Sequence, residues 1–171
     1  MTTDIGSLAP GLERRSPGIW FAREQGAVSY PGGGNAACLA VEESSFWFRH
    51  RNRCIAQVVR RFRPAGPLLD IGGGNGYVAR GLQQAGIDCV LVEPGVDGAL
   101  AAHARGVEPV VCARLEDAGF LPGTFSAAGL FDVLEHIEDE ASALNGIRSL
   151  LAPGGRLFVT VPAFQLSLIH I

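Results

Sequence analysis

From residue 67 onwards, short and almost wholly apolar runs alternate along the chain with amphipathic stretches. Short apolar runs between turn residues are typical of buried strands, and apolar residues spaced three and four apart are typical of helices. Strands that are apolar on both faces belong to a parallel sheet covered by helices on both sides. The alternation therefore predicts an α/β fold with a doubly wound, mostly parallel Rossmann-like sheet. The expected strands cover 67–71, 88–93, 109–113, 127–134 and 156–162. The expected helices lie in the stretches 76–86, 96–106 and 138–155, and Pro153, Gly154 and Gly155 are expected to stop the last one.

The length of 171 residues suits one α/β domain. The composition changes near residue 66, because residues 1–66 are rich in aromatic residues and arginine. Within them, 44–62 is expected to be a helix that caps the sheet, and residues 67–164 are expected to form the ligand-binding α/β core. Residues 165–171 do not continue the pattern of the last strand, so we expect a non-native or truncated tail.

Composition and charge exclude several classes of protein. The formal net charge of −3 argues against a surface built to bind nucleic acid. The sequence shows no basic segment followed by an apolar run at its start, and no apolar run long enough to cross a bilayer. The four cysteines are widely spaced, which favours apolar core residues over zinc ligands or disulfides. We therefore expect a cytoplasmic protein without a membrane span.

The stretch LLDIGGGNG, residues 68–76, places four glycines directly after the first expected strand. A glycine-rich turn between a strand and a helix lets a ligand approach the backbone closely. Gly74, Gly76 and Ala79 match the spacing of dinucleotide-binding turns, and Glu93 follows about where an acid would bind the ribose. An NAD(P)- or FAD-binding oxidoreductase is therefore one interpretation of this turn.

Asp70, at the tip of the first expected strand, favours a different ligand. A carboxylate at this place would repel a diphosphate by on the order of a kcal/mol or more. It would attract S-adenosyl-L-methionine, which carries a cationic sulfonium and a cationic ammonium and has no phosphate. Gly72, Gly74 and Gly76 would leave room for the methionine part of that ligand. Glu93 would accept hydrogen bonds from both ribose hydroxyls.

Five segments, in order, resemble the motifs of the class I S-adenosylmethionine-dependent methyltransferases. They are LLDIGGGNG (68–76), LVEP (91–94), CARLED (112–117), FDVLEHIED (131–139) and LLAPGGRLFVTVP (150–162). The resemblance spans residues 67–162 and implies the class I fold, the cofactor S-adenosyl-L-methionine and methyl transfer by in-line displacement. FDVLEHI resembles a subgroup that includes the methyltransferases of ubiquinone biosynthesis, which implies a small-molecule or lipid-linked acceptor.

The resemblance also implies roles for single residues. In such relatives an arginine on an upstream helix reaches the methionine carboxylate, and Arg51 lies at a matching distance before the glycine turn, with Arg53 as the competing choice. A guanidinium suits this role because it can pair with a carboxylate through two hydrogen bonds. The implied cofactor-binding residues are Arg51, Asp70, Gly72, Gly74, Gly76, Glu93, Arg114, Leu115, Glu116 and Asp132, of which Arg114, Leu115 and Glu116 would border the adenine.

Methyl transfer depends mainly on aligning the nucleophile, the methyl carbon and the sulfur. If the acceptor is a hydroxyl, a general base would help, and the candidate catalytic residues are His136 and Glu135. Some relatives hold magnesium at the acidic and histidine positions of this segment. Asp132, Glu135 and His136 have suitable chemistry, but no metal site is predicted. The alternative is that His136 caps or packs at a helix start and Glu135 accepts a backbone donor.

A complete class I fold has two further strands after the fifth, whereas this chain ends nine residues beyond Pro162. We therefore expect a C-terminally truncated sheet that lacks its last strands. A non-catalytic fragment that binds the cofactor without turnover is the third interpretation of the sequence.

Overall fold

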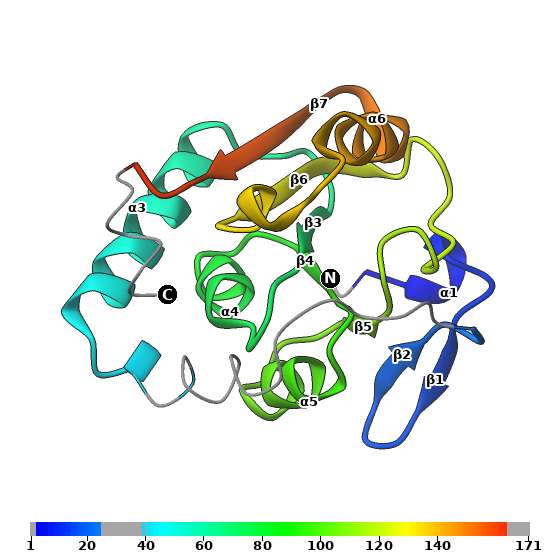
Figure 1. The fold of residues 1–171 in the computed structure, drawn as a ribbon, viewed down its shortest axis with the longest axis horizontal. Helices are drawn as coiled ribbons and strands as arrows, with labels where there is room; N and C mark the ends of the chain where they lie inside the picture. The colour runs from blue at the N-terminus through cyan, green and yellow to red at the C-terminus, as the bar shows by residue number, and fades with distance from the viewer. Residues whose placement is uncertain (1–2, 25–38, 40, 164–171) are drawn as a thin grey trace.

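The computed structural model of the chain describes residues 3–24, 39 and 41–163. These residues form a seven-stranded sheet in the order β1-β2-β5-β4-β3-β6-β7 (Figure 1). Every neighbouring pair is parallel except β1 with β2. The strand order changes direction at β3, which confirms the predicted doubly wound α/β fold. The strands are β1 (Glu13–Arg15), β2 (Ile19–Phe21), β3 (Leu68–Ile71), β4 (Cys89–Glu93), β5 (Val110–Cys112), β6 (Phe125–Phe131) and β7 (Leu151–Thr160).

Helices cover both faces of this sheet (Figure 1). One core lies between the sheet and α3, α4 and α5, and it receives Leu68 of β3; the other lies beneath α1 and α6 and receives Leu69. Successive strand residues point to opposite faces, so a strand buried on both faces must be apolar at every position except those with a special role. The helices are α1 (Ile5–Leu8), α3 (Phe46–Arg61), α4 (Tyr77–Gln84), α5 (Val96–Ala104) and α6 (Glu140–Leu150), with a 3₁₀ turn η1 (Leu134–His136).

The hairpin formed by β1 and β2 was not expected from the sequence. Its strands have three residues each, and β1 carries the exposed charges of Glu13, Arg14 and Arg15. Short edge strands with charged side chains give no alternating apolar pattern, although they protect a sheet edge from pairing with other chains. The hairpin extends the sheet beyond β5, so part of the N-terminal segment lies in the same sheet as the core. The division of the chain near residue 66 stays a prediction.

Two predicted boundaries near the C-terminal end of the described chain were wrong. The helix that Pro153, Gly154 and Gly155 were expected to stop already ends at Leu150, and β7 begins directly at Leu151. Phe125 pairs with Leu151 while Ala127 pairs with Arg156, so the Pro-Gly-Gly segment bulges out between two paired parts of β7. The fourth expected strand ends at Phe131 and not at residue 134.

Within the described residues β7 is an edge strand of the sheet. The expected tail 165–171 lies outside the described residues, and the truncation of the chain stays a prediction. In the described part of the chain, no helix has the length and apolar character required to cross a membrane.

Gly76 tests how tightly the first turn packs on the neighbouring helix. It caps α4 with φ +74°, and a Cβ there would lie 2.7 Å from the Ala102 Cβ and 2.9 Å from the Val107 Cγ2. Gly76→Ala is therefore expected to lower the free energy of unfolding by about 2–4 kcal/mol in urea denaturation. Gly119→Ala is the control, because Gly119 has φ +63° and no atom within 4 Å of its Cβ position, and it should cost about 1 kcal/mol. If both variants lost the same free energy of unfolding, the close contact at Gly76 would be absent.

Candidate active site

Apart from Arg51 on α3, the predicted site residues lie at or just after the ends of parallel strands, at the same edge of the sheet. Ligands of doubly wound sheets bind at this edge, where the strand order changes direction. The change occurs at β3, whose carboxyl end continues into the glycine turn and then into α4. The turn, the end of β4 and the end of β6 therefore surround one candidate site.

The three glycines singled out in the sequence all adopt backbone conformations that favour glycine. Gly72, Gly74 and Gly76 have φ values of 65°, 51° and 74°. Backbone hydrogen bonds close the turn, among them those from Gly72 N–H to the Val92 carbonyl (2.8 Å) and from Gly76 N–H to the Gly73 carbonyl (2.9 Å). A Cβ on Gly72 would lie 3.1 Å from Val133, so the chain after β6 packs directly against the turn.

Glu93 connects the end of β4 to the glycine turn. Its Oε2 accepts a hydrogen bond from Gly74 N–H (2.9 Å), and its Oε1 accepts one from Gly95 N–H (2.8 Å). Burial raises the pKa of the Glu93 carboxyl, and the two amide donors oppose that rise. The sequence predicted Glu93 as a ligand for ribose hydroxyls, but it did not predict that the same carboxylate holds the turn.

Asp70 is buried beneath the turn with 1 % of its surface exposed. Neither of its carboxylate oxygens accepts a hydrogen bond of good geometry from the described residues, although the backbone of Ala79 is close enough to lower its pKa. Burial raises the pKa of Asp70 to about 7, with the Glu93 charge adding to the rise and the Arg51 charge opposing it. A buried polar group without a partner is costly, so Asp70 is a strong candidate for contact with a ligand.

A buried ion pair supports the turn from the side of α5. Arg105 follows α5 and pairs with Glu42 at 2.8 Å, and both side chains are 9 % exposed. The same guanidinium donates to the backbone carbonyl of Asn75 (3.0 Å) and stacks over Tyr77. The sequence did not single out Arg105, because a basic residue at a helix end is usually explained by the helix dipole alone.

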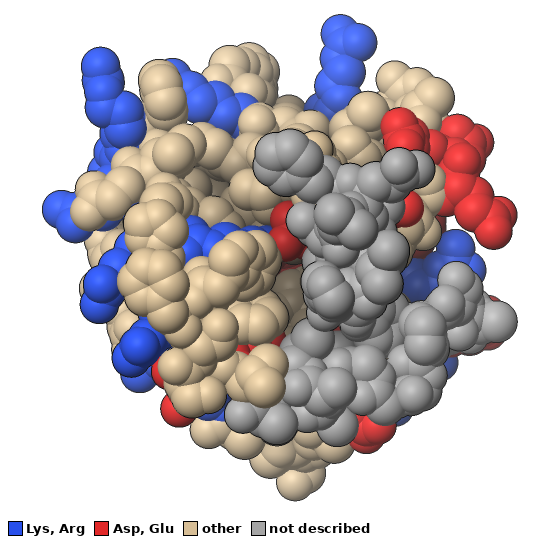
Figure 2. Space-filling view, turned by 60° about the vertical axis from the view of Figure 1, so that its left-hand side comes forward, with Lys and Arg blue, Asp and Glu red and all other residues tan. Residues whose placement is uncertain are grey.

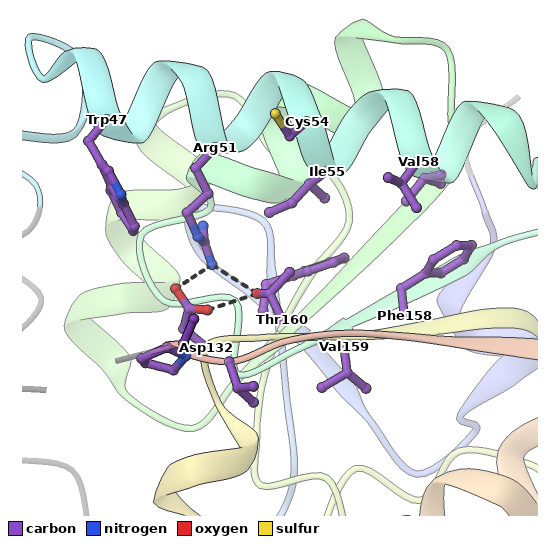
Figure 3. Close-up of a pocket in the computed structure, with 14 residues that line it drawn as sticks. Trp47, Arg51, Cys54, Ile55, Val58, Asp132, Phe158, Val159 and Thr160 are labelled. Carbon is purple, nitrogen blue, oxygen red and sulfur yellow. Dashed lines mark hydrogen bonds and ion pairs between the residues drawn. The ribbon is translucent and has the colours of Figure 1, made fainter. Parts of the chain in front are cut away.

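Arg51 points from α3 towards the ends of β6 and β7 (Figure 3). Its Nη2 lies 2.8 Å from Asp132 Oδ2 and 3.4 Å from Thr160 Oγ1. Asp132 is the first residue after β6 and has a left-handed φ of 62°, which explains why the strand ends before it. Thus the structure brings together two predicted site residues, Arg51 and Asp132, whereas the competing Arg53 is exposed on the same helix.

A cavity of about 480 Å³ lies between α3 and the ends of β6 and β7 (Figure 3). Its lining is mostly apolar, and its polar end is formed by Arg51, Asp132 and Thr160. The apolar lining comes from Trp47, Ile55, Val58, Val59, Phe131, Phe158, Val159, Val161, Pro162 and Ala163, with Cys54 beside them. Such a cavity has the size and character of a small-molecule site.

The surface on the α3 side is mainly uncharged, with arginine side chains projecting at its left edge in the view of Figure 2. Phe46, Trp47, Val58 and Phe62 of this region are all at least half exposed. The arginines and aromatic residues of α3 are therefore divided between the surface and the cavity.

The other predicted site residues are more exposed. Arg114 and Glu116 pair with each other at 3.4 Å in the turn after β5, and Leu115 packs against the core beneath α1 and α6. His136 is exposed in η1. Both oxygens of Glu135, its neighbour, are buried and have no hydrogen-bond partner among the described residues, so the alternative role of Glu135 as a partner of a backbone donor finds no such donor there. The described residues contain no group of three side chains that could hold a metal ion.

The protonation of Asp70 gives a prediction for stability. Its pKa is about 7 in the folded chain against an ordinary 3.8, so between these pH values the folded protein keeps a proton that the unfolded chain releases. The free energy of unfolding should therefore fall, through this group, as the pH rises from about 4 to about 7.

Asp70→Asn should remove this fall and raise the free energy of unfolding at pH 8 by a few kcal/mol. Urea denaturation at several pH values measures both effects. Asp97→Asn changes an exposed acid on α5 and is the control. Its free energy of unfolding should depend on pH in the same way as that of the unmodified chain. A variant of Asp70 that is less stable at pH 8 and keeps the original slope would contradict the buried, unpartnered carboxylate.

Comparison with known proteins identifies the family of the chain. The family model described as "Methyltransferase domain" matches residues 46–169, which is more than half of the chain. Ubiquinone biosynthesis O-methyltransferases are among the similar curated proteins. That of Xylella fastidiosa is 29 % identical over 113 residues, covering 60 % of this chain and 46 % of the relative. That of Aeromonas salmonicida is 31 % identical over 99 residues, covering 54 % of this chain and 42 % of the relative. The chain thus spans about half the length of the curated relatives it matches.

Solved structures show the same fold. The Haemonchus contortus phosphoethanolamine N-methyltransferase 2 in complex with S-adenosyl-L-methionine gives a TM-score of 0.62 at 24 % identity, covering 78 % of this chain and 34 % of that one. The sugar N-methyltransferase KedS8 of a Streptoalloteichus species gives a TM-score of 0.59 at 23 % identity, covering 81 % of this chain and 59 % of that one. From the family match, the strand order and the glycine turn, we conclude that the chain belongs to the class I S-adenosylmethionine-dependent methyltransferases.

Proposed function

We propose that this chain binds S-adenosyl-L-methionine at the glycine turn and carries the cofactor half of an enzyme that methylates a small-molecule or lipid-linked acceptor. The observation that carries the proposal is the pair of buried carboxylates, Asp70 and Glu93, at the ends of adjacent strands beside the turn. A diphosphate would add negative charge to this pair, whereas a cationic ligand would offset it.

The residues present fit the cofactor. The unpartnered carboxylate of Asp70 would be stabilised by the positive charges of the methionine part. Each carboxylate oxygen of Glu93 accepts one amide hydrogen and keeps a second lone pair, which could accept a ribose hydroxyl. Arg51 would pair with the methionine carboxylate. The turn Arg114–Glu116 after β5 would border the adenine, as the family resemblance implies.

The bound cofactor would supply an electron-poor methyl carbon. The acceptor nucleophile would form a bond to that carbon while the carbon–sulfur bond breaks and its electron pair stays on sulfur. The protein's contribution is alignment, together with removal of the acceptor's proton if the acceptor is a hydroxyl. We propose that His136 or Glu135 accepts this proton. The buried carboxylate oxygens of Glu135 have no hydrogen-bond partner among the described residues, so they are available to accept it.

The cavity beside α3 supports an acceptor with an apolar body. Its polar end is formed by Arg51 and Asp132, two of the predicted cofactor-binding residues, and its apolar lining includes Phe158 and Val159 of β7. The curated relatives are named for ubiquinone biosynthesis and a structural neighbour is named for phosphoethanolamine, so small-molecule acceptors are the class we propose.

We also propose a reducing compartment, the cytoplasm, for this protein. Cys54 and Cys89 carry free thiols, and Cys89 lies buried in β4 as a small core residue.

Calorimetry of the full chain with S-adenosylhomocysteine tests the proposal. We expect micromolar or tighter binding and no response to NADH. Glu93→Ala should weaken the affinity about 10- to 100-fold, because it removes the ribose acceptors and the hydrogen bond that holds the turn. Asp97→Ala, at an exposed acid on α5, is the control and should stay within about twofold of the unmodified chain.

Two results would reject this function. One is a folded chain that fails to bind S-adenosylhomocysteine at high micromolar concentration. The other is a fluorescence response to NADH or NADPH without one to S-adenosylhomocysteine, which would favour the oxidoreductase interpretation.

A further inference from the structure

We infer that Thr160 is a positioning residue, which holds the Arg51 guanidinium so that it can receive the methionine carboxylate of the cofactor. The inference rests on the proposed function and deepens it. Thr160 is the last residue of β7 and lines the polar end of the cavity (Figure 3). The cofactor-binding roles assigned above do not include it.

Thr160 contacts both members of the ion pair. Its hydroxyl donates to Asp132 Oδ1 (2.8 Å) and accepts from Arg51 Nη2 (3.4 Å), while Arg51 Nη2 lies 2.8 Å from Asp132 Oδ2. The backbone of Thr160 also takes part, because Asp132 N–H donates to its carbonyl (3.0 Å). Thr160 thus determines where the Asp132 carboxylate lies and which of its oxygens faces Arg51.

This arrangement leaves most of the guanidinium available to a ligand. An arginine and a carboxylate tend to form two parallel hydrogen bonds, which would direct the guanidinium fork at Asp132. The Thr160 hydroxyl occupies Oδ1, so Arg51 reaches Asp132 through a single nitrogen, Nη2. Among the described residues, Asp132 and Thr160 are the acceptors that Arg51 contacts, so its remaining N–H groups could pair with a second carboxylate. The Trp47 ring, 5.7 Å from the guanidinium carbon, restricts the side chain from another side.

The segments involved are far apart in the sequence. Arg51 belongs to α3 and Thr160 to β7, and they are separated by 109 positions. Arginine loses considerable rotamer entropy when it is held in one position. A hydroxyl that is fixed to the sheet therefore lowers the cost of presenting Arg51 to a ligand.

The experiment compares two ligands that differ in the amino-acid part. S-adenosylhomocysteine carries the carboxylate, and 5′-methylthioadenosine lacks it. Thr160→Val removes the hydroxyl with little change of shape in a strand, and Thr160→Ser keeps the hydroxyl as the matched control. Calorimetry gives the dissociation constant of each ligand for each full-length variant, and urea denaturation confirms that each is folded.

Thr160→Val is expected to weaken the affinity for S-adenosylhomocysteine about tenfold. The affinity for 5′-methylthioadenosine should change by no more than about twofold, since only the carboxylate contact depends on Arg51. Thr160→Ser should stay within about twofold for both ligands. In an Arg51→Met background, Thr160→Val should have no further effect on S-adenosylhomocysteine, because the two residues act through one contact.

Unchanged affinity of Thr160→Val for S-adenosylhomocysteine would overturn the inference and leave the proposed function intact. Equal weakening of both ligands would also overturn it, since that result indicates a general structural role. If the unmodified chain binds neither ligand, the proposed function itself fails and the inference fails with it.

Discussion

The burial of the Asp70 carboxylate at the end of the central strand is the constraint on which the rest of the site depends. β3 has a neighbour on both sides and a core on each face, so all four of its residues are buried. A charge there is costly unless something compensates for it. The described residues supply no hydrogen bond of good geometry to it, and the charge of Arg51 on α3 and the backbone of Ala79 only partly offset the effect of burial on its pKa. The site is therefore prepared for a positive group before any ligand arrives.

The glycine turn above Asp70 is held from several sides. Glu93 binds the amide of Gly74 from β4, and Arg105 binds the carbonyl of Asn75 from the end of α5. Val133 packs on Gly72 from the segment after β6. A turn that is held in this way loses little further entropy when a ligand binds, which is the physical basis of preorganised binding. The Glu93 carboxylate holds the turn through the Gly74 amide, and its role as an acceptor for ribose hydroxyls stays a prediction.

The sequence predicted the parts of this protein that depend on local pattern. The strands β3, β4 and β5 and the helices α4 and α5 follow from short apolar runs and helical spacing between Gly and Pro. Boundaries were wrong where tertiary pairing prevailed over local signals. The Pro-Gly-Gly segment terminates a helix in local terms, yet β7 starts before it because Leu151 pairs with Phe125. The hairpin of β1 and β2 carries no periodic signal and forms because the edge of β5 offers it backbone partners.

The sequence by itself determined the doubly wound fold, the glycine turn and the two acids beside it, because glycine and carboxylate at the end of a buried strand have few other uses. Only the tertiary structure decided how Arg51, Asp132 and Thr160 meet, and how Arg105 reaches the turn from a neighbouring helix. Such contacts join segments that are distant in the sequence, and their geometry depends on how helices pack on the sheet. A polar residue within VTVP is the one local signal for Thr160, and it becomes informative only when its hydroxyl is seen between an arginine and an aspartate.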